Sequence, residues 1–111
     1  MEDLNAYRRI VRELIERYAS FTPARGDVQI EAIFDEAKDH YELIYAGWNG
    51  PYRIHGSVVH IDIRDGKVWI QHDGTERGFA RDLEAGGVPR DHIVLAFQHL
   101  SRRRLGDYAA A

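Results

Sequence analysis

The dipeptide Asp65-Gly66 lies between two runs in which apolar and polar residues alternate, and it constrains the fold of this chain more than any other feature. An Asp-Gly pair in this setting favours the type I′ turn of a two-residue β-hairpin. Such a turn fixes the register, because each residue before it must face a residue after it. Counting outward predicts that Arg64 faces Lys67 and, four pairs later, that His60 faces Gln71.

This register gives the hairpin an apolar face and a polar face. The apolar face carries five aliphatic side chains that we expect in the core: Val59, Ile61, Ile63, Val68 and Ile70. The polar face carries an imidazole, an indole, an amide and two carboxylates: His60, Asp62, Trp69, Gln71 and Asp73. A sheet face of this composition is either a binding surface or a solvated face of an antiparallel sheet.

A helix is expected before the hairpin, with Asp3 as its N-cap and its end near Ser20, because apolar residues recur there at steps of three and four. The stretch from Thr22 to Gly26 contains a proline and a glycine and should break this helix. Alternating residues at 27–34, with Val28, Ile30, Ala32 and Phe34 inward, then predict the first strand.

Further strands are predicted at 40–48, 52–64 and 67–72. Four successive strands with short connections favour an antiparallel meander. The second and third strands carry apolar residues on both faces. We therefore expect partial cover of the second sheet face, by a helix or by another subunit.

A second helix is expected to begin near Asp73, either through a capping box of Asp73 with Glu76 or with Thr75 as the N-cap. Gly86-Gly87 should end it. The apolar run 93–97 is compatible with a buried strand or a helical turn, because periodicity cannot separate the two. The predicted fold class is α+β: an N-terminal helix, a four-stranded antiparallel meander, a short helix and a small C-terminal α/β tail, in one domain of residues 1–111.

The composition excludes several classes of protein. The chain has 111 residues, no cysteine and a net charge of −3, which excludes disulfides and thiolate metal sites and argues against a broad nucleic-acid footprint. Its first residues lack the apolar core of a signal peptide, and no segment has the length of a membrane span. These properties predict a cytoplasmic protein without membrane association.

His60 and Asp62 are candidate metal ligands, because they lie two residues apart and so share a strand face. A mononuclear site would need a third ligand, such as His40 or His55. The sequence has none of the usual spacings of metal ligands, such as HxH, HExxH or paired cysteines. We therefore expect that the protein needs no metal and no other cofactor to fold.

Enzymatic activity is not expected either. The pairs His60–Asp62 and His72–Glu76 could exchange protons, but general acid–base catalysis also needs a pocket. No serine lies in a nucleophile elbow, and no glycine-rich phosphate loop is present.

Two further groups are candidates for binding. The aromatic residues Trp48, Tyr52 and Trp69 could stack on nucleic-acid bases, although tryptophans on strands are usually packing residues that are exposed only at interfaces. The triplet Arg102, Arg103 and Arg104 is a candidate for contact with nucleic-acid phosphates, although a short basic run in an acidic chain is more often a solvated helix end or a protein–protein contact. The predicted partner-binding residues are those of the polar face together with Trp48: His60, Asp62, Trp69, Gln71, Asp73 and Trp48.

Over essentially its whole length the chain resembles the XisI family, known as controlling factors for excision of the fdxN element in cyanobacteria. The resemblance lies in these motifs: Tyr7-Arg8, Ile10-Val11, Pro23, Gly26-Asp27, Asp39-His40-Tyr41, Gly47-Trp48, Arg53-Ile54-His55-Gly56, His60-Ile61-Asp62-Ile63, Asp65-Gly66-Lys67-Val68-Trp69-Ile70-Gln71, Asp73-Gly74-Thr75-Glu76, Gly87-Val88-Pro89 and Ile93-Val94-Leu95. The tail departs from the family, because Gln98-His99-Leu100 lacks a proline that the family carries there.

The resemblance implies an accessory factor without catalytic residues of its own. It implies a partner, the nuclease-like protein XisH, while the excision chemistry belongs to a separate recombinase. The leading hypothesis is therefore a non-enzymatic controlling factor that binds a XisH-like protein. The alternatives are a small enzyme or ligand-binding domain that uses His60, Asp62, Gln71 and Asp73, and direct DNA binding through the arginine triplet. Self-association into a homo-oligomer is also left open.

Overall fold

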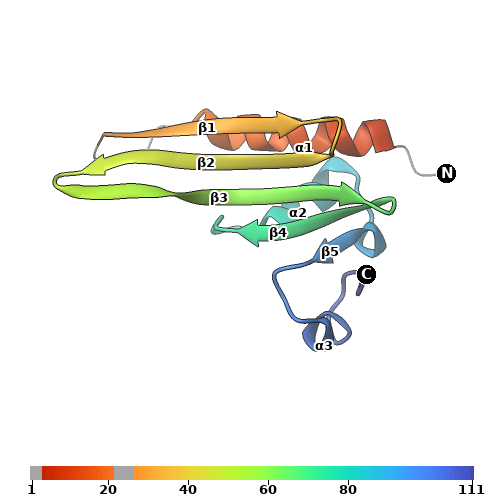
Figure 1. Cartoon of the computed structure of the whole chain (residues 1–111). Helices are drawn as coiled ribbons and strands as arrows, with labels where there is room; N and C mark the ends of the chain where they lie inside the picture. Colours follow the sequence, from red (N-terminus) through yellow and green to blue (C-terminus); the bar gives the residue numbers. More distant parts are fainter. Residues whose placement is uncertain (1–3, 22–26) are drawn as a thin grey trace.

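The computed structural model describes residues 4–21 and 27–111. Its elements follow the order α1 (Leu4–Ala19), β1 (Asp27–Asp35), β2 (His40–Asn49), β3 (Tyr52–Arg64), β4 (Lys67–Asp73), α2 (Phe79–Gly86), the 3-10 turn η1 (Arg90–His92), β5 (Ile93–Leu95) and α3 (Leu100–Arg103) (Figure 1). The predicted N-cap Asp3 and the predicted break at 22–26 lie outside the described residues. No helix within the described ranges is long and apolar enough to cross a membrane.

The five strands form one mixed sheet in the order β1-β2-β3-β4-β5. The first four strands pair antiparallel with their sequence neighbours, which confirms the predicted α+β class and the meander. The run 93–97 supplies a fifth strand, Ile93–Leu95, that pairs parallel with β4. A parallel neighbour requires a crossover connection, and α2 provides it. The prediction of four strands was therefore one strand short.

The Asp65-Gly66 turn has positive φ at both residues, 55° and 76°, as a type I′ turn requires. Arg64 faces Lys67, and the predicted pairing continues to Ile61 opposite Ile70. The five aliphatic residues of the predicted apolar face are all buried: Val59, Ile61, Ile63, Val68 and Ile70. The register and the choice of core face are confirmed over this part of the hairpin.

A β-bulge changes the pairing immediately after Ile61. His60 faces His72 rather than Gln71, and Val59 faces Asp73. Gln71 is the extra residue that a bulge inserts into one strand. The predicted His60–Gln71 pair is therefore wrong. The bulge also moves Asp73 from the polar face to the opposite side of the sheet.

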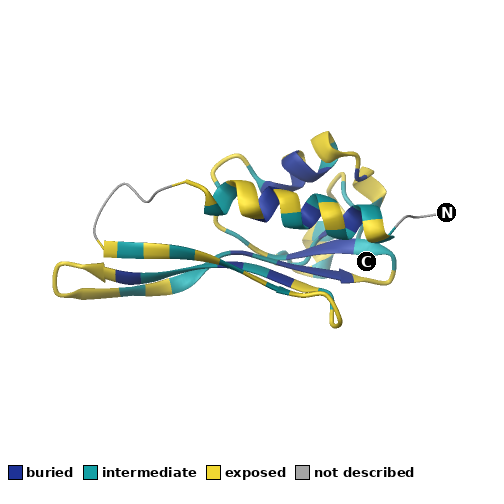
Figure 2. Cartoon of the chain, turned by 90° about the horizontal axis from the view of Figure 1, so that it is seen from above, coloured by how far each residue is buried: buried dark blue, intermediate teal, exposed yellow. Residues whose placement is uncertain are grey.

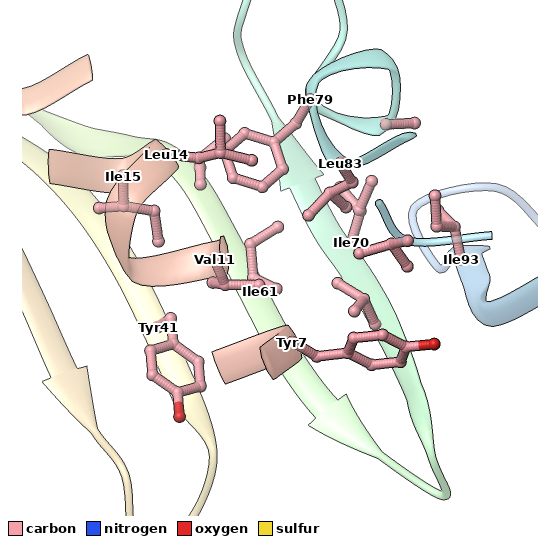
Figure 3. Close-up of a cluster of buried hydrophobic side chains, with 14 of the residues drawn as sticks. Tyr7, Val11, Leu14, Ile15, Tyr41, Ile61, Ile70, Phe79, Leu83 and Ile93 are labelled. Atoms are coloured by element: carbon pink, nitrogen blue, oxygen red, sulfur yellow. The ribbon is translucent and has the colours of Figure 1, made fainter. Parts of the chain in front are cut away.

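The core lies between one face of the sheet and the two helices α1 and α2 (Figures 2 and 3). Tyr7, Val11, Leu14 and Ile15 of α1 are buried, as their helical spacing predicts. Phe79 and Leu83 bring α2 onto the same core. We name the opposite side of the sheet the outer face; the polar cluster described below lies there.

The helix α2 begins at Phe79, six residues later than Asp73. The predicted start at 73–76 was wrong, because the Asp73 side chain caps a helix that begins six residues further along the chain. One carboxylate oxygen accepts from the amide and hydroxyl of Thr75, and the other accepts from the amide of Phe79 at 2.7 Å. The predicted helix end is confirmed: α2 stops at Gly86, and Gly87 takes the left-handed conformation, with φ 112°.

The paired ends of β2 and β3 extend past the end of α1 (Figure 2). We name residues 45–56 the hairpin arm. The 13 residues of β3 span about 43 Å as a strand, whereas the 16 residues of α1 span about 24 Å as a helix. Gly47 lets β1 approach closely, because a Cβ there would lie 2.0 Å from the carbonyl oxygen of Asp27. Trp48 and Tyr52, at the end of the arm, are exposed.

Asp39 joins α1 to the turn between β1 and β2. It accepts two hydrogen bonds from the Arg8 guanidinium, at 2.8 and 2.9 Å, and a third from the Tyr41 hydroxyl. The Arg8 hydrogen bond is the main reason that the pKa of Asp39 lies below its ordinary value. Burial, with the bond to Asp39, raises the pKa of Tyr41 to about 12.

Asp39→Asn is expected to destabilise the protein at neutral pH and to matter less in acid. A carboxylate whose pKa is lowered by folding stabilises the folded state above its unfolded pKa of about 3.9, and that stabilisation disappears as the pH falls through the folded pKa. Asparagine tolerates the positive φ of 55° at this position. Urea unfolding from pH 7 to pH 2.5 should show the gap between wild type and variant narrowing below pH 4. A constant gap would contradict this assignment.

Candidate functional site

The main polar cluster of the outer face forms where β2, β3 and β4 run side by side. His40 begins β2 and lies directly opposite Asp62 on β3. His60 lies two residues before Asp62, so both side chains share this face. The bulge on β4 brings Gln71 to the same place. Three separate strand segments therefore deliver four polar side chains to one point.

Asp62 is the centre of this cluster. Its Oδ1 atom accepts from Nδ1 of His40 and, at 3.1 Å, from Nε2 of His60. Its Oδ2 atom accepts from Nε2 of Gln71 at 3.2 Å. Asp62 is 9% exposed, whereas both imidazoles remain partly open to solvent. We name His40, His60, Asp62 and Gln71 the His-Asp cluster.

The predicted partner-binding residues do not form one patch. His60, Asp62 and Gln71 meet in the His-Asp cluster. Asp73 lies on the other side of the sheet, where it caps α2. His72, which was not predicted for this face, takes the position opposite His60.

Trp69 lies beside Asp62 on the outer face but is only 9% exposed. Its indole N–H donates to the carbonyl of Arg64 at 3.0 Å. The guanidinium groups of Arg64 and Arg103 lie 4.2 and 6.0 Å from the ring centre. The chain itself therefore covers Trp69, which limits its use as an exposed anchor for a partner.

Trp48 keeps the exposure that an anchor needs. It is 48% exposed on the hairpin arm, and the guanidinium of Arg53 lies 5.2 Å from its ring centre. A shallow hollow beside it is lined by Asp27, Gln29, Ala46, Gly47, Trp48 and Arg53. The predicted partner-binding residues included Trp48 but not Arg53, which lies opposite Trp48 in the β2–β3 pairing. The sequence did carry a signal for this exposed end. The strands predicted at 40–48 and 52–64 reach further, end to end, than the first helix can cover.

Like the two tryptophans, the three arginines of the triplet differ in exposure. Arg103 donates to the carbonyls of Gln98 and Ala110, at 3.1 and 2.7 Å, and so fastens the C-terminal segment. Arg102 and Arg104 are exposed. Only these two are therefore placed for contact with phosphates.

The sequence model of the XisI family, described as XisI protein, matches residues 1–110. The chain belongs to the XisI family. A crystal structure of a XisI-like protein from Anabaena variabilis ATCC 29413 is 39% identical and has a TM-score of 0.92, covering 98% of this chain and 100% of that one. The fdxN element excision controlling factor XisI from the same organism is 31% identical with a TM-score of 0.85, over 97% and 98% of the two chains. The comparison with curated proteins gave no match.

Several residues that carry the XisI resemblance hold the fold together. Tyr7 bonds through its hydroxyl to Nδ1 of His92 at 2.6 Å, which ties α1 to the turn before β5. Arg8 binds Asp39 and so ties the same helix to the β1–β2 turn. His40, His60 and Asp62 have no comparable role in the core. Among the described residues, the His-Asp cluster and the hairpin arm are therefore candidates for function, beside Arg102 and Arg104.

Proposed function

We propose that this XisI-family protein is a non-enzymatic controlling factor for DNA-element excision that acts in the cytoplasm by binding a XisH-like nuclease-type protein. Family membership supports the role in excision, because the relative at 31% identity is named as an excision controlling factor. Partner binding is the further step, and it rests on the hairpin arm.

The single observation that carries the partner-binding proposal is the exposure of two aromatic side chains at the end of the arm. Trp48 is 48% exposed and Tyr52 is 73% exposed. Aromatic residues and arginine are enriched at the energetic centres of protein interfaces, and Arg53 lies against Trp48. An arm that extends past α1 can present these groups without steric interference from the helices.

The arrangement also favours binding over catalysis. Catalytic groups usually converge in a concave pocket that excludes water. The His-Asp cluster instead lies on an open sheet face, with both imidazoles partly exposed. Asp73, which the enzyme alternative required on that face, bonds to Thr75 and Phe79 on the other side.

Trp48→Ala is expected to weaken the complex with a XisH-like partner by about thirtyfold or more, since an aromatic anchor commonly contributes about 2 kcal/mol of binding free energy. Calorimetry with a purified XisH-like protein measures the effect. Ile33→Ala is the matched control, because Ile33 is an exposed apolar residue of β1 outside the arm. Its affinity should equal that of wild type.

Three results would redirect or reject the proposal. Unchanged affinity in Trp48→Ala, with a loss in the double variant Arg102→Gln and Arg104→Gln, would move the interface to the C-terminal segment. Absence of binding by the wild-type protein would reject the partner hypothesis. A salt-dependent interaction of the wild type with duplex DNA, lost in the double arginine variant, would favour direct DNA contact instead.

A further inference from the structure

We propose that the His-Asp cluster binds one divalent transition-metal ion, through Nδ1 of His40, Nε2 of His60 and Oδ1 of Asp62. One ligand atom from each of these three residues lies within 4.8 Å of the other two. Two imidazoles and one carboxylate form a common ligand set for such ions. The inference is independent of the partner proposed above.

One of the three ligand separations already suits a shared ion. Ligand atoms that each lie about 2.1 Å from one ion are about 3.0–3.4 Å apart in octahedral or tetrahedral geometry. Nε2 of His60 and Oδ1 of Asp62 are 3.1 Å apart. Nδ1 of His40 approaches the same oxygen atom, so both ring nitrogens already point at one place. Both imidazoles are partly exposed, so their rings can rotate to make room for the ion.

The backbone holds the three ligands in place. His40 and Asp62 are paired residues of the β2–β3 ladder, and His60 lies two positions along the same strand. The backbone amide of Ile63 donates to the carbonyl of Asp39 at 3.0 Å, which fixes the start of β2 against β3. A site on paired strands is more precisely positioned than one on loops.

Gln71 acts as a positioning residue for the carboxylate. It donates to Oδ2 of Asp62 at 3.2 Å and so leaves Oδ1 directed at the two imidazoles. Hydrogen bonds of this kind, one step removed from the ion, orient metal ligands and raise affinity. The β-bulge supplies this contact, because it adds Gln71 to β4 beside Asp62. Bulges often redirect a side chain next to a functional site.

The ligand types define the class of ion. Imidazole favours zinc, nickel, cobalt and copper, whereas magnesium and calcium prefer oxygen atoms alone. Three protein ligands leave coordination positions for water or for a donor atom of another molecule. Since the core lies on the opposite face of the sheet, we expect the protein to fold without the ion. The expectation that the protein folds without metal is therefore retained.

Titration of tag-free, chelator-treated protein with zinc tests the proposal. We expect one ion per chain by calorimetry, and a visible cobalt spectrum on titration with Co²⁺. His40→Ala and His60→Ala should each weaken binding by more than about 100-fold, and Gln71→Ala by about 10–100-fold, the range typical of residues that orient a ligand. His55→Ala is the matched control, because His55 is an exposed histidine of the same strand outside the cluster. It should bind as wild type does.

Each contrary outcome would overturn the site. Wild-type protein that takes up no zinc, nickel or cobalt would leave the cluster as a hydrogen-bonded group of side chains only. Unchanged affinity in both His40→Ala and His60→Ala would assign any bound ion to another place. A thermal unfolding midpoint near that of the chelator-treated wild type shows that each variant is folded. His40 and His60 are partly exposed, so we expect both variants to pass this check.

Discussion

Ile61→Ala is expected to lower the free energy of unfolding by about 2–5 kcal/mol. Ile61 is fully buried in the middle of β3 and lies in the cluster formed with α1 and α2 (Figure 3). The substitution removes three carbon atoms and leaves a cavity, because the hydrogen-bonded strands on either side cannot collapse into it. Urea denaturation at neutral pH measures the change.

Ile33→Ala provides the matched control for this effect. Both positions are isoleucines in strands, but Ile33 is exposed on the outer face of β1. A substitution there should change stability by no more than about 0.5 kcal/mol. Equal effects at the two positions would show that the five aliphatic residues of the hairpin do not form the main core.

Trp69→Ala is expected to destabilise the protein by about 3 kcal/mol, the lower end of the range for buried tryptophan. The indole is 9% exposed, donates to the Arg64 carbonyl and lies beneath two guanidinium groups. Those arginine side chains can partly fill the space, which limits the loss. The sequence suggested Trp69 as a partner anchor, whereas its surroundings predict an effect on stability first.

The effect of Trp48→Ala on stability should differ from that of Trp69→Ala. Trp48 lies on the same outer face but is about half exposed, so its loss should change the unfolding free energy by less than about 1 kcal/mol. Thermal and urea unfolding of both variants provide the comparison. A Trp69→Ala protein as stable as wild type would return this residue to the set of candidate anchors.

The contrast between correct and incorrect predictions has a physical basis at the hairpin. Asp65-Gly66 and the alternation beside it encode a local geometry, so counting from the turn was correct as far as Ile61 and Ile70. The bulge at Gln71 has no comparable local signal. It depends on how β4 meets both β3 and the segment that leads into α2, which counting from one turn cannot detect.

The His-Asp cluster shows a similar limit. His60 and Asp62 were grouped because a strand places alternate residues on one face. His40 was one of two candidates for a third ligand, and only the pairing of β2 with β3 brings it opposite Asp62. The start of α2 was placed too early for a related reason. Asp73 is a capping residue, but it reaches Phe79 across a five-residue turn.

None of the helices within the described residues covers the hairpin arm, and this affects the arm's local stability. Residues 59–63 of β3 lie beneath two helices, whereas residues 45–56 have few buried apolar contacts to resist opening (Figure 2). Segments of that kind open at a lower free energy than the core, and their amide hydrogens exchange faster. The arm should therefore be adaptable in the free protein, and a partner that orders it would give up part of its binding free energy in doing so. The affinity of this surface for a partner would then depend on the conformational stability of the paired strands as well as on their direct contacts with the partner.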